Sequence, residues 1–182
     1  MEQNKERKEK KRRGRRGYLA DFHQTATGEY VYGGEIHRFD GPGSWKRAMA
    51  GLWGLVLVML ASAVAAGCVP AAGVDRTAYV TLPYALALVW AVSVTWLMAR
   101  WTLGGPNLRD YIYQATVRQV KFRGVATAAC TAATLIGECV FLLRNGWCGR
   151  MGGTVALLLL LAAELVTVTV WTMLAGRLRW SK

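Results

Sequence analysis

Two glutamates lie within otherwise apolar segments of the C-terminal half of the chain. Glu138 falls in the run 124–143 and Glu164 in the run 154–175. An ionisable side chain within a membrane-spanning helix is costly to bury and often takes part in proton or ion transfer. The sequence therefore suggests a proton or cation relay between two helices. The alternative is that both acids are neutral and bind neighbouring helices through hydrogen bonds, with Glu138 also able to reach outward towards Arg150.

Three threonines precede Glu138 on the same helix. Thr127, Thr131, Thr134 and Glu138 follow one another at spacings of four, three and four, which places them on one helical face. We expect this face to point into protein or water. At about 1.5 Å of rise per residue, Glu138 and Glu164 differ in depth by about 8 Å. A direct carboxylate pair is therefore not expected.

Two acid-x-histidine triplets occur before the first apolar run. Asp21 and His23, and likewise Glu35 and His37, would share one side of an extended strand, and together they offer four metal ligands. Nothing in the sequence fixes one triplet relative to the other, and exposed His and Glu are ordinary on such a segment. We therefore expect no metal site and no cofactor. Without a Ser-His, Cys-His or HExxH arrangement, we expect no catalytic residues and no enzymatic activity.

Two cysteines are candidates for a disulfide. Cys68 lies at the outer end of the first apolar run, and Cys148 lies in the loop between the third and fourth runs. A bridge between them requires an oxidising outer side and Cα atoms within about 7 Å of each other.

Four apolar runs set the architecture that must position these groups. Each is at least twenty residues long with no more than one charge, and they cover 48–69, 78–99, 124–143 and 154–175. An α-helix needs this length to cross hydrocarbon, where an open sheet would leave amides unpaired. We therefore predict an all-α membrane protein with four transmembrane helices, arranged as two helical hairpins over 48–99 and 124–175.

The positions of Lys and Arg predict the orientation of these helices. Twelve basic residues precede the first run, five lie in 100–123 and three in 176–182, whereas the remaining loops hold Arg76, Arg144 and Arg150. Positive charge favours the cytoplasmic side. We therefore predict an N-in/C-in topology with a cytoplasmic tail at 176–182, in a bacterial cytoplasmic membrane.

The N-terminal segment 1–17 is predicted to be a disordered basic arm. Residues 5–16 carry nine Lys and Arg against two glutamates and have no apolar stripe to bury. Such an arm is attracted to anionic lipid headgroups, or it serves only as the topology signal that keeps the N-terminus inside. Without a recognisable module, nucleic-acid binding is not expected.

Residues 18–47 form a predicted cytoplasmic segment with a β-hairpin at 29–39. Gly33-Gly34 lies between two short strand-like runs and suits a tight turn. Pairing outward from this turn gathers aromatic and polar side chains on one face. A lone two-stranded hairpin is marginally stable, so we expect it to contact a protein partner or a second copy of the chain. The residues predicted to make that contact are Tyr30, Tyr32, His37 and Phe39.

The loop 100–123 is predicted to contain an amphipathic helix on the inner membrane surface. Gly104-Gly105-Pro106 breaks the chain, and Asn107 can cap a following helix with Asp110 near its positive end. Apolar residues recur at helical spacing among basic ones up to Phe122. A docking site for a cytosolic protein is the alternative interpretation.

These features favour a non-enzymatic accessory or assembly subunit that contacts partners through its cytoplasmic face. The alternative is a small oligomeric proton-coupled transporter or channel that uses Glu138 and Glu164. Four spans without a broken helix, and without a charged partner for the acids at matching depth, disfavour transport.

Overall fold

The computed structural model of the chain describes residues 22–24, 30–41, 43–147 and 150–181. The helices in this part are α2 Trp45–Cys68, α3 Ala72–Arg76, α4 Ala78–Gly104, α5 Asp110–Ala115, the short 3₁₀ helix η2 Val117–Gln119, α6 Val120–Asn145 and α7 Met151–Arg177. The strands are β1 Phe22–Gln24, β2 Tyr30–Tyr32, β3 Ile36–Phe39, β4 Asn107–Arg109 and β5 Trp180–Ser181. The predicted basic arm 1–17 lies outside the described residues.

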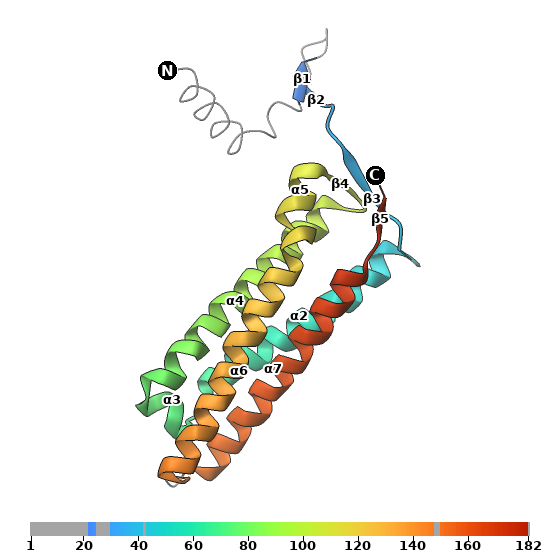
Figure 1. The fold of residues 1–182 in the computed structure, drawn as a ribbon. Coiled ribbons are helices and arrows are strands. Elements are labelled where there is room, and N and C mark those ends of the chain that lie inside the picture. Colours follow the sequence, from blue (N-terminus) through green and yellow to red (C-terminus); the bar gives the residue numbers. More distant parts are fainter. Residues whose placement is uncertain (1–21, 25–29, 42, 148–149, 182) are drawn as a thin grey trace, which may run out of the picture.

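The long helices α2, α4, α6 and α7 run up and down beside one another as a bundle (Figure 1). Within the described part of the chain, these four helices are long and apolar enough to cross a membrane, which confirms the four long apolar helices predicted from the sequence. α2 packs chiefly against α7 and α4 chiefly against α6, and α6 and α7 also pack closely. The first predicted hairpin, α2 with α4, has the least extensive contact of the four neighbouring pairs.

The bundle core follows a heptad pattern. Inward-facing residues recur at alternating intervals of three and four, as α7 illustrates with Thr154, Leu157, Leu161, Glu164, Val168, Trp171 and Ala175. Helices with this spacing pack side chains as knobs into holes and supercoil gently in a left-handed sense. The same spacing therefore decides which side chains meet in the interior, including the buried polar ones.

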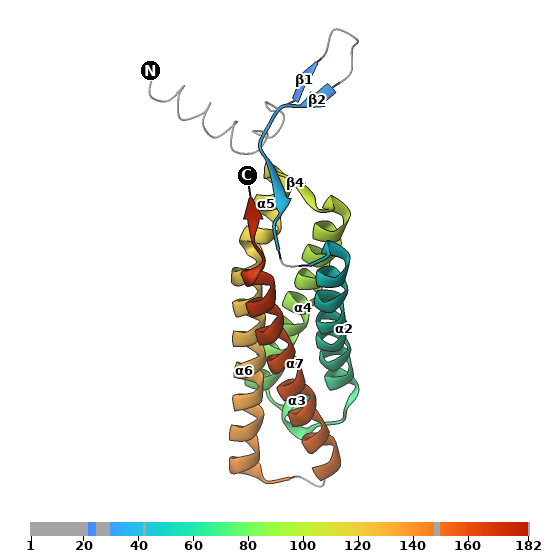
Figure 2. The same cartoon turned by 90° about the vertical axis from the view of Figure 1, so that its right-hand side faces the viewer.

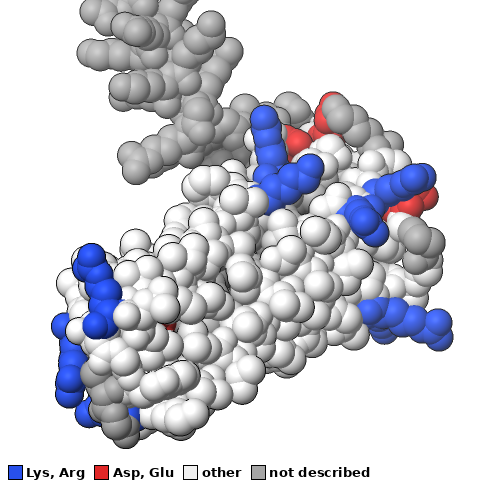
Figure 3. Space-filling model, turned by 60° about the horizontal axis from the view of Figure 1, so that its bottom comes forward, with Lys and Arg blue, Asp and Glu red and all other residues white. Residues whose placement is uncertain are grey.

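The outward faces of the long helices are also apolar. Leu82, Trp96 and Leu159 are 64%, 69% and 67% exposed, respectively. On the face shown in Figure 3, Lys and Arg gather towards the two ends of the molecule, and uncharged atoms cover most of the surface between them. An apolar belt between charged ends is what a lipid-embedded bundle presents. The protein is therefore a membrane-embedded helical bundle.

A three-stranded antiparallel sheet closes one end of the bundle. β3 lies at its centre between β4 and β5, so the segments before α2, after α4 and after α7 meet there. His37 lies opposite Leu108 and Phe39 opposite Trp180. We call the end of the bundle formed by β3, β4 and β5 the sheet end, and β3, β5 and the C-terminus lie together there in Figure 2.

The predicted hairpin at 29–39 is wrong. β2 pairs with β1, with Phe22 opposite Tyr32, whereas β3 pairs with β4 and β5. Gly33-Gly34 therefore links two separate sheets and is not a hairpin turn. Tertiary pairing overrides the local turn signal because β3 gains two antiparallel neighbours from distant parts of the chain.

The predicted amphipathic helix of the loop 100–123 is also wrong in its main part. Asn107 begins the strand β4 and caps no helix, and Leu108, the middle residue of this strand, is fully buried. The helix that follows, α5, has only six residues before the chain turns through η2 into α6. Pairing of Leu108 with His37 requires extended backbone, which excludes a helix beginning at Asn107.

The opposite end of the bundle contains an element that the apolar pattern did not predict. The short helix α3 connects α2 to α4 and packs against both α4 and α6. Its Gly73 is buried, and Asp75 forms an ion pair with Arg150 at the start of α7. This end therefore has a packed helical turn that connects α2 to α4, contacts α6 and is linked to the start of α7 by an ion pair.

Candidate functional site

The predicted polar face of α6 is buried in the bundle interior. Thr127, Thr131, Thr134 and Glu138 each have 0% of their surface exposed, and the same is true of Glu164 on α7. The heptad spacing of α6 carries these side chains inward among Val120, Gly124, Gly137 and Phe141. The acids and threonines named from the sequence are therefore core residues of the bundle.

Only one of the three threonine hydroxyls bonds another helix. Thr131 donates to Oε1 of Glu164 on α7, with an oxygen–oxygen distance of 3.1 Å. Thr127 and Thr134 instead donate to the carbonyls four residues before them on α6, at 2.8 and 2.9 Å. Thr131 and Glu164 thus form a polar contact between α6 and α7, whereas the hydroxyls of Thr127 and Thr134 bond backbone carbonyls of their own helix.

Glu164 has a sparse polar environment. Its Oε2 atom is buried and has no hydrogen-bond partner among the described residues, and no Lys, Arg or His of the described chain forms an ion pair with it. A buried carboxylate anion without a countercharge is costly. This site, with one hydroxyl donor and apolar neighbours such as Leu161 and Val168 on α7, therefore suits a neutral carboxyl.

Glu138 bonds the connecting helix α3. The backbone N–H of Gly73, in the first turn of α3, donates to Glu138 Oε1 at 3.3 Å, while Oε2 has no partner among the described residues. A Cβ atom on residue 73 would overlap the Glu138 carboxyl group, so a larger residue there requires the Glu138 side chain or α3 to shift. The alternative in which Glu138 reaches towards Arg150 is not observed, because Arg150 pairs with Asp75 and Glu138 accepts from Gly73.

The two acids belong to separate contacts. Glu138 holds α3 at the end opposite the sheet, and Glu164 joins Thr131 two helical turns deeper. In the described part of the chain, no hydrogen bond connects one acid to the other. This agrees with the separation in depth that rise per residue predicts.

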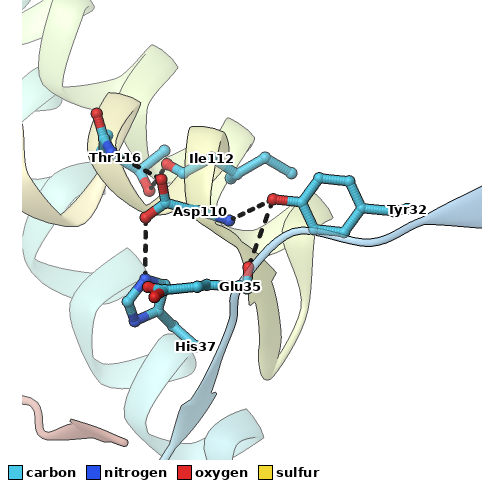
Figure 4. A network of polar contacts seen from close by, with 7 residues as sticks. Tyr32, Glu35, His37, Asp110, Ile112 and Thr116 are labelled. Carbon is cyan, nitrogen blue, oxygen red and sulfur yellow. Dashed lines mark hydrogen bonds and ion pairs between the residues drawn. The ribbon is translucent and has the colours of Figure 1, made fainter. Parts of the chain in front are cut away.

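At the sheet end, three of the four residues predicted to contact a partner make contacts within the chain. Tyr32 donates its hydroxyl hydrogen to the Glu35 carbonyl at 3.4 Å and accepts from the Asp110 N–H at 3.3 Å (Figure 4). His37 is 5% exposed, and its ring stacks on Tyr113 with centroids 4.1 Å apart. The Tyr30 side chain lies outside the described residues.

Phe39, the remaining predicted contact residue, belongs to an aromatic cluster. Its ring meets Trp45 at 5.2 Å and Trp180 at 5.8 Å between centroids. Trp180 also lies 6.2 Å from the buried Trp101. Strand β5 has only two residues, too few to be recognised from the sequence.

No structural partner of Asp110 could be predicted from the sequence. Its Oδ1 atom lies 3.1 Å from Nε2 of His37, and its Oδ2 accepts from Gln114 at 2.7 Å. The sequence signal was Asp110 at the start of a helix, which is correct for α5. His37 and Asp110 are 73 residues apart in the sequence, and the pairing of β3 with β4 brings them together.

The predicted disulfide stays a prediction. Cys68 is the last residue of α2 and is exposed. Cys148 lies outside the described residues.

Comparison with protein-family models, with characterised proteins and with solved structures finds no match to this chain. The function must therefore be inferred from the geometry of the bundle and of its sheet end.

Proposed function

We propose that the chain is a non-enzymatic, multi-pass membrane protein that acts as an accessory or assembly subunit and binds a protein partner at its sheet end. The observation that carries this proposal is the position of β1 and β2. They pair with each other beyond the sheet and stand clear of the helices (Figures 1 and 2). A two-stranded pair is marginally stable alone, and its strand edges suit addition to a partner's sheet.

The architecture of the sheet end supports the same proposal. β3, β4 and β5 tie the segment before α2, the α4–α6 connection and the segment after α7 into one unit. β2 precedes β3 by only a few residues, so a partner bound to β1 and β2 would be tethered to the bundle through a short link. The partner is a different protein or a second copy of this chain.

The distribution of charge supports a cytoplasmic position for the sheet end. Basic residues there come from several segments of the chain: Arg38, Lys46, Arg47, Arg100, Arg109, Arg118, Lys121, Arg123, Arg177 and Arg179. The opposite end has Arg76, Arg144 and Arg150. Because basic loops favour the cytoplasm, we infer that both termini lie on the cytoplasmic side of a bacterial cytoplasmic membrane, with the arm 1–17 near anionic headgroups.

The hydrogen bonds of the two buried acids are consistent with a structural role. Glu138 bonds α3, and Glu164 bonds α6 through Thr131. Interhelical hydrogen bonds of this kind hold membrane bundles together.

The proposal is tested by affinity purification of the tagged full-length protein from native membranes. We expect a co-purifying protein, or a stable homo-oligomer, whose yield falls at least fivefold in the double variant Tyr30→Ala/Val31→Ala. The matched control is Tyr79→Ala, which removes an exposed tyrosine on α4. A monomer without partners, or equal yields from the double variant and the wild type, contradicts the proposal.

A second candidate is a small oligomeric proton-coupled transporter or channel. It is favoured by the buried Oε2 atoms of Glu138 and Glu164, which lack partners among the described residues and offer places for a moving proton. Reconstituted liposomes loaded with a pH-sensitive dye test it. Proton flux above empty liposomes that Glu164→Gln abolishes supports this candidate, whereas wild-type flux equal to that of empty liposomes contradicts it.

A further inference from the structure

Three potential metal ligands meet at the sheet end. Glu35 lies just before β3, His37 lies within it, and Asp110 is the first residue of α5. One donor atom from each of the three lies within 4.8 Å of the others. In Figure 4 the Asp110 carboxylate points at Nε2 of His37, and the Glu35 side chain extends over the same space.

The spacing of these atoms suits a divalent transition metal. Zn²⁺ binds nitrogen and oxygen at about 2.0–2.2 Å, so a tetrahedral ion holds its ligand atoms roughly 3.3 Å apart. Nε2 of His37 and Oδ1 of Asp110 are 3.1 Å apart. One imidazole and two carboxylates form a donor set that zinc-type ions accept. A donor atom of Glu35 lies within 4.8 Å of the other two, so a small movement of its side chain would bring it to coordinating distance.

Neighbouring contacts hold the ligands in place before any ion binds. The His37 ring stacks nearly parallel on Tyr113, and Gln114 donates to the second carboxylate oxygen of Asp110. The backbone N–H of Asp110 donates to the Glu35 carbonyl at 3.0 Å. Such outer contacts orient ligands and raise metal affinity.

The cluster is reachable from water on one side. The His37 side chain is 7% exposed and that of Asp110 is 33% exposed, while Glu35 is an exposed residue. An ion bound here would have the buried His37 imidazole on one side and a coordination position open to water on the other.

We propose that Glu35, His37 and Asp110 bind one divalent transition-metal ion of the Zn²⁺ type, with three protein ligands and one position open to water. The ion joins β3 to the α4–α6 connection and so stabilises the sheet end. Asp21 and the side chain of His23, the other candidate ligands from the sequence, lie outside the described residues.

A titration of the purified full-length protein with Zn²⁺, after treatment with a chelator, tests this site. We expect one bound ion per chain and a higher thermal unfolding midpoint at saturating Zn²⁺. His37→Gln and Asp110→Asn should weaken binding by about 100-fold, because loss of even an outer-shell partner costs 10–100-fold. Glu35→Gln, at an exposed position that tolerates the change, should weaken binding by at least about tenfold.

Matched controls separate this site from other ligands in the chain. His23→Gln changes the other histidine, and Asp40→Asn changes an acid just after β3, so both should keep wild-type affinity. Co²⁺ in place of Zn²⁺ should give a visible spectrum without a thiolate charge-transfer band. Unchanged affinity in His37→Gln, an equal loss in His23→Gln, or a thiolate band overturns the proposal. These measurements do not depend on any partner protein.

Discussion

The Thr131 hydroxyl donates to the Glu164 carboxyl across the interface of α6 and α7, at 3.1 Å. Both residues are fully buried. Among Thr127, Thr131 and Thr134, only Thr131 donates its hydroxyl hydrogen to another helix. The bond therefore couples the two helices, whereas the hydroxyls of Thr127 and Thr134 stabilise α6 alone.

Thr131→Val should destabilise the bundle. The change keeps the shape of the side chain and removes the donor, leaving Oε1 of Glu164 unpaired. Interhelical hydrogen bonds in membranes contribute about 0.6 kcal/mol on average and up to about 1.7 kcal/mol, and we expect a loss in that range. Unfolding of the protein in mixed micelles by a denaturing detergent measures it.

The matched controls for that prediction are Thr127→Val and Thr134→Val. Their hydroxyls bond carbonyls that already accept a helical N–H, so each should change the free energy of unfolding by less than about 0.5 kcal/mol. Equal losses of unfolding free energy in all three valine variants would show that the bond to Glu164 contributes no more stability than the bonds within α6.

Gly73→Ala should destabilise the end of the bundle opposite the sheet. The added Cβ atom would overlap the Glu138 carboxyl group, which displaces α3 or forces Glu138 into another rotamer. Overpacking of this kind costs about 1–3 kcal/mol. The same unfolding assay measures the loss, and Gly54→Ala is the control, since a Cβ atom there meets open space.

A double variant separates steric overlap from a general effect of alanine in α3. Gly73→Ala/Glu138→Ala removes the carboxyl that the new methyl group meets. We expect its destabilisation to be smaller than the sum of the two single losses, by at least about 0.5 kcal/mol. Strict additivity would contradict a direct contact between the two positions.

The membrane bundle could be predicted from the sequence because its signal is local. Each span carries its own apolar run, and the burial of Thr131 and Glu138 follows from helical periodicity on one segment. The sheet end could not be predicted in the same way. β4 and β5 have three and two residues, too few for a recognisable pattern, and they gain their strand conformation from β3.

The same limit applies to the polar contacts. Periodicity gives the face of a residue but not its partner on another element. Glu164 could thus be placed in the core while Thr131, as its particular donor, could not be distinguished from Thr127 or Thr134. The contact between His37 and Asp110 depends on the strand register of β3 with β4, which the Gly33-Gly34 signal obscured.

Trp180→Ala should loosen β5 from β3. The Trp180 ring contacts Phe39, Trp45, Trp101 and Tyr113, so its removal leaves a gap in the aromatic cluster. Loss of a large aromatic ring from a core costs about 3–5 kcal/mol, and the half-buried Trp180 should cost less than that. Hydrogen exchange should speed up at the amide of Asp40, which donates to the Arg179 carbonyl.

The control for the aromatic cluster is Trp96→Ala, which removes a ring that is 69% exposed on the outer face of α4. Exchange at Asp40 should then keep its wild-type rate. Equal protection of Asp40 in Trp180→Ala and the wild type would mean that backbone pairing alone holds β5.

Tyr84→Phe should weaken the contact between α2 and α4. The Tyr84 hydroxyl donates to the Ala63 carbonyl at 2.7 Å, and this bond lies at the least extensively packed interface of neighbouring helices. Its loss should cost about 1 kcal/mol, measured by unfolding in mixed micelles. Tyr79→Phe, at a 48% exposed position on the same helix, should leave stability unchanged.

Gly67→Ala should weaken the same hydrogen bond between Tyr84 and Ala63, because a Cβ atom on residue 67 meets the Tyr84 hydroxyl. The combined variant Gly67→Ala/Tyr84→Phe should therefore lose less stability than the two single changes together, and a fully additive loss would place the effect of Gly67 elsewhere.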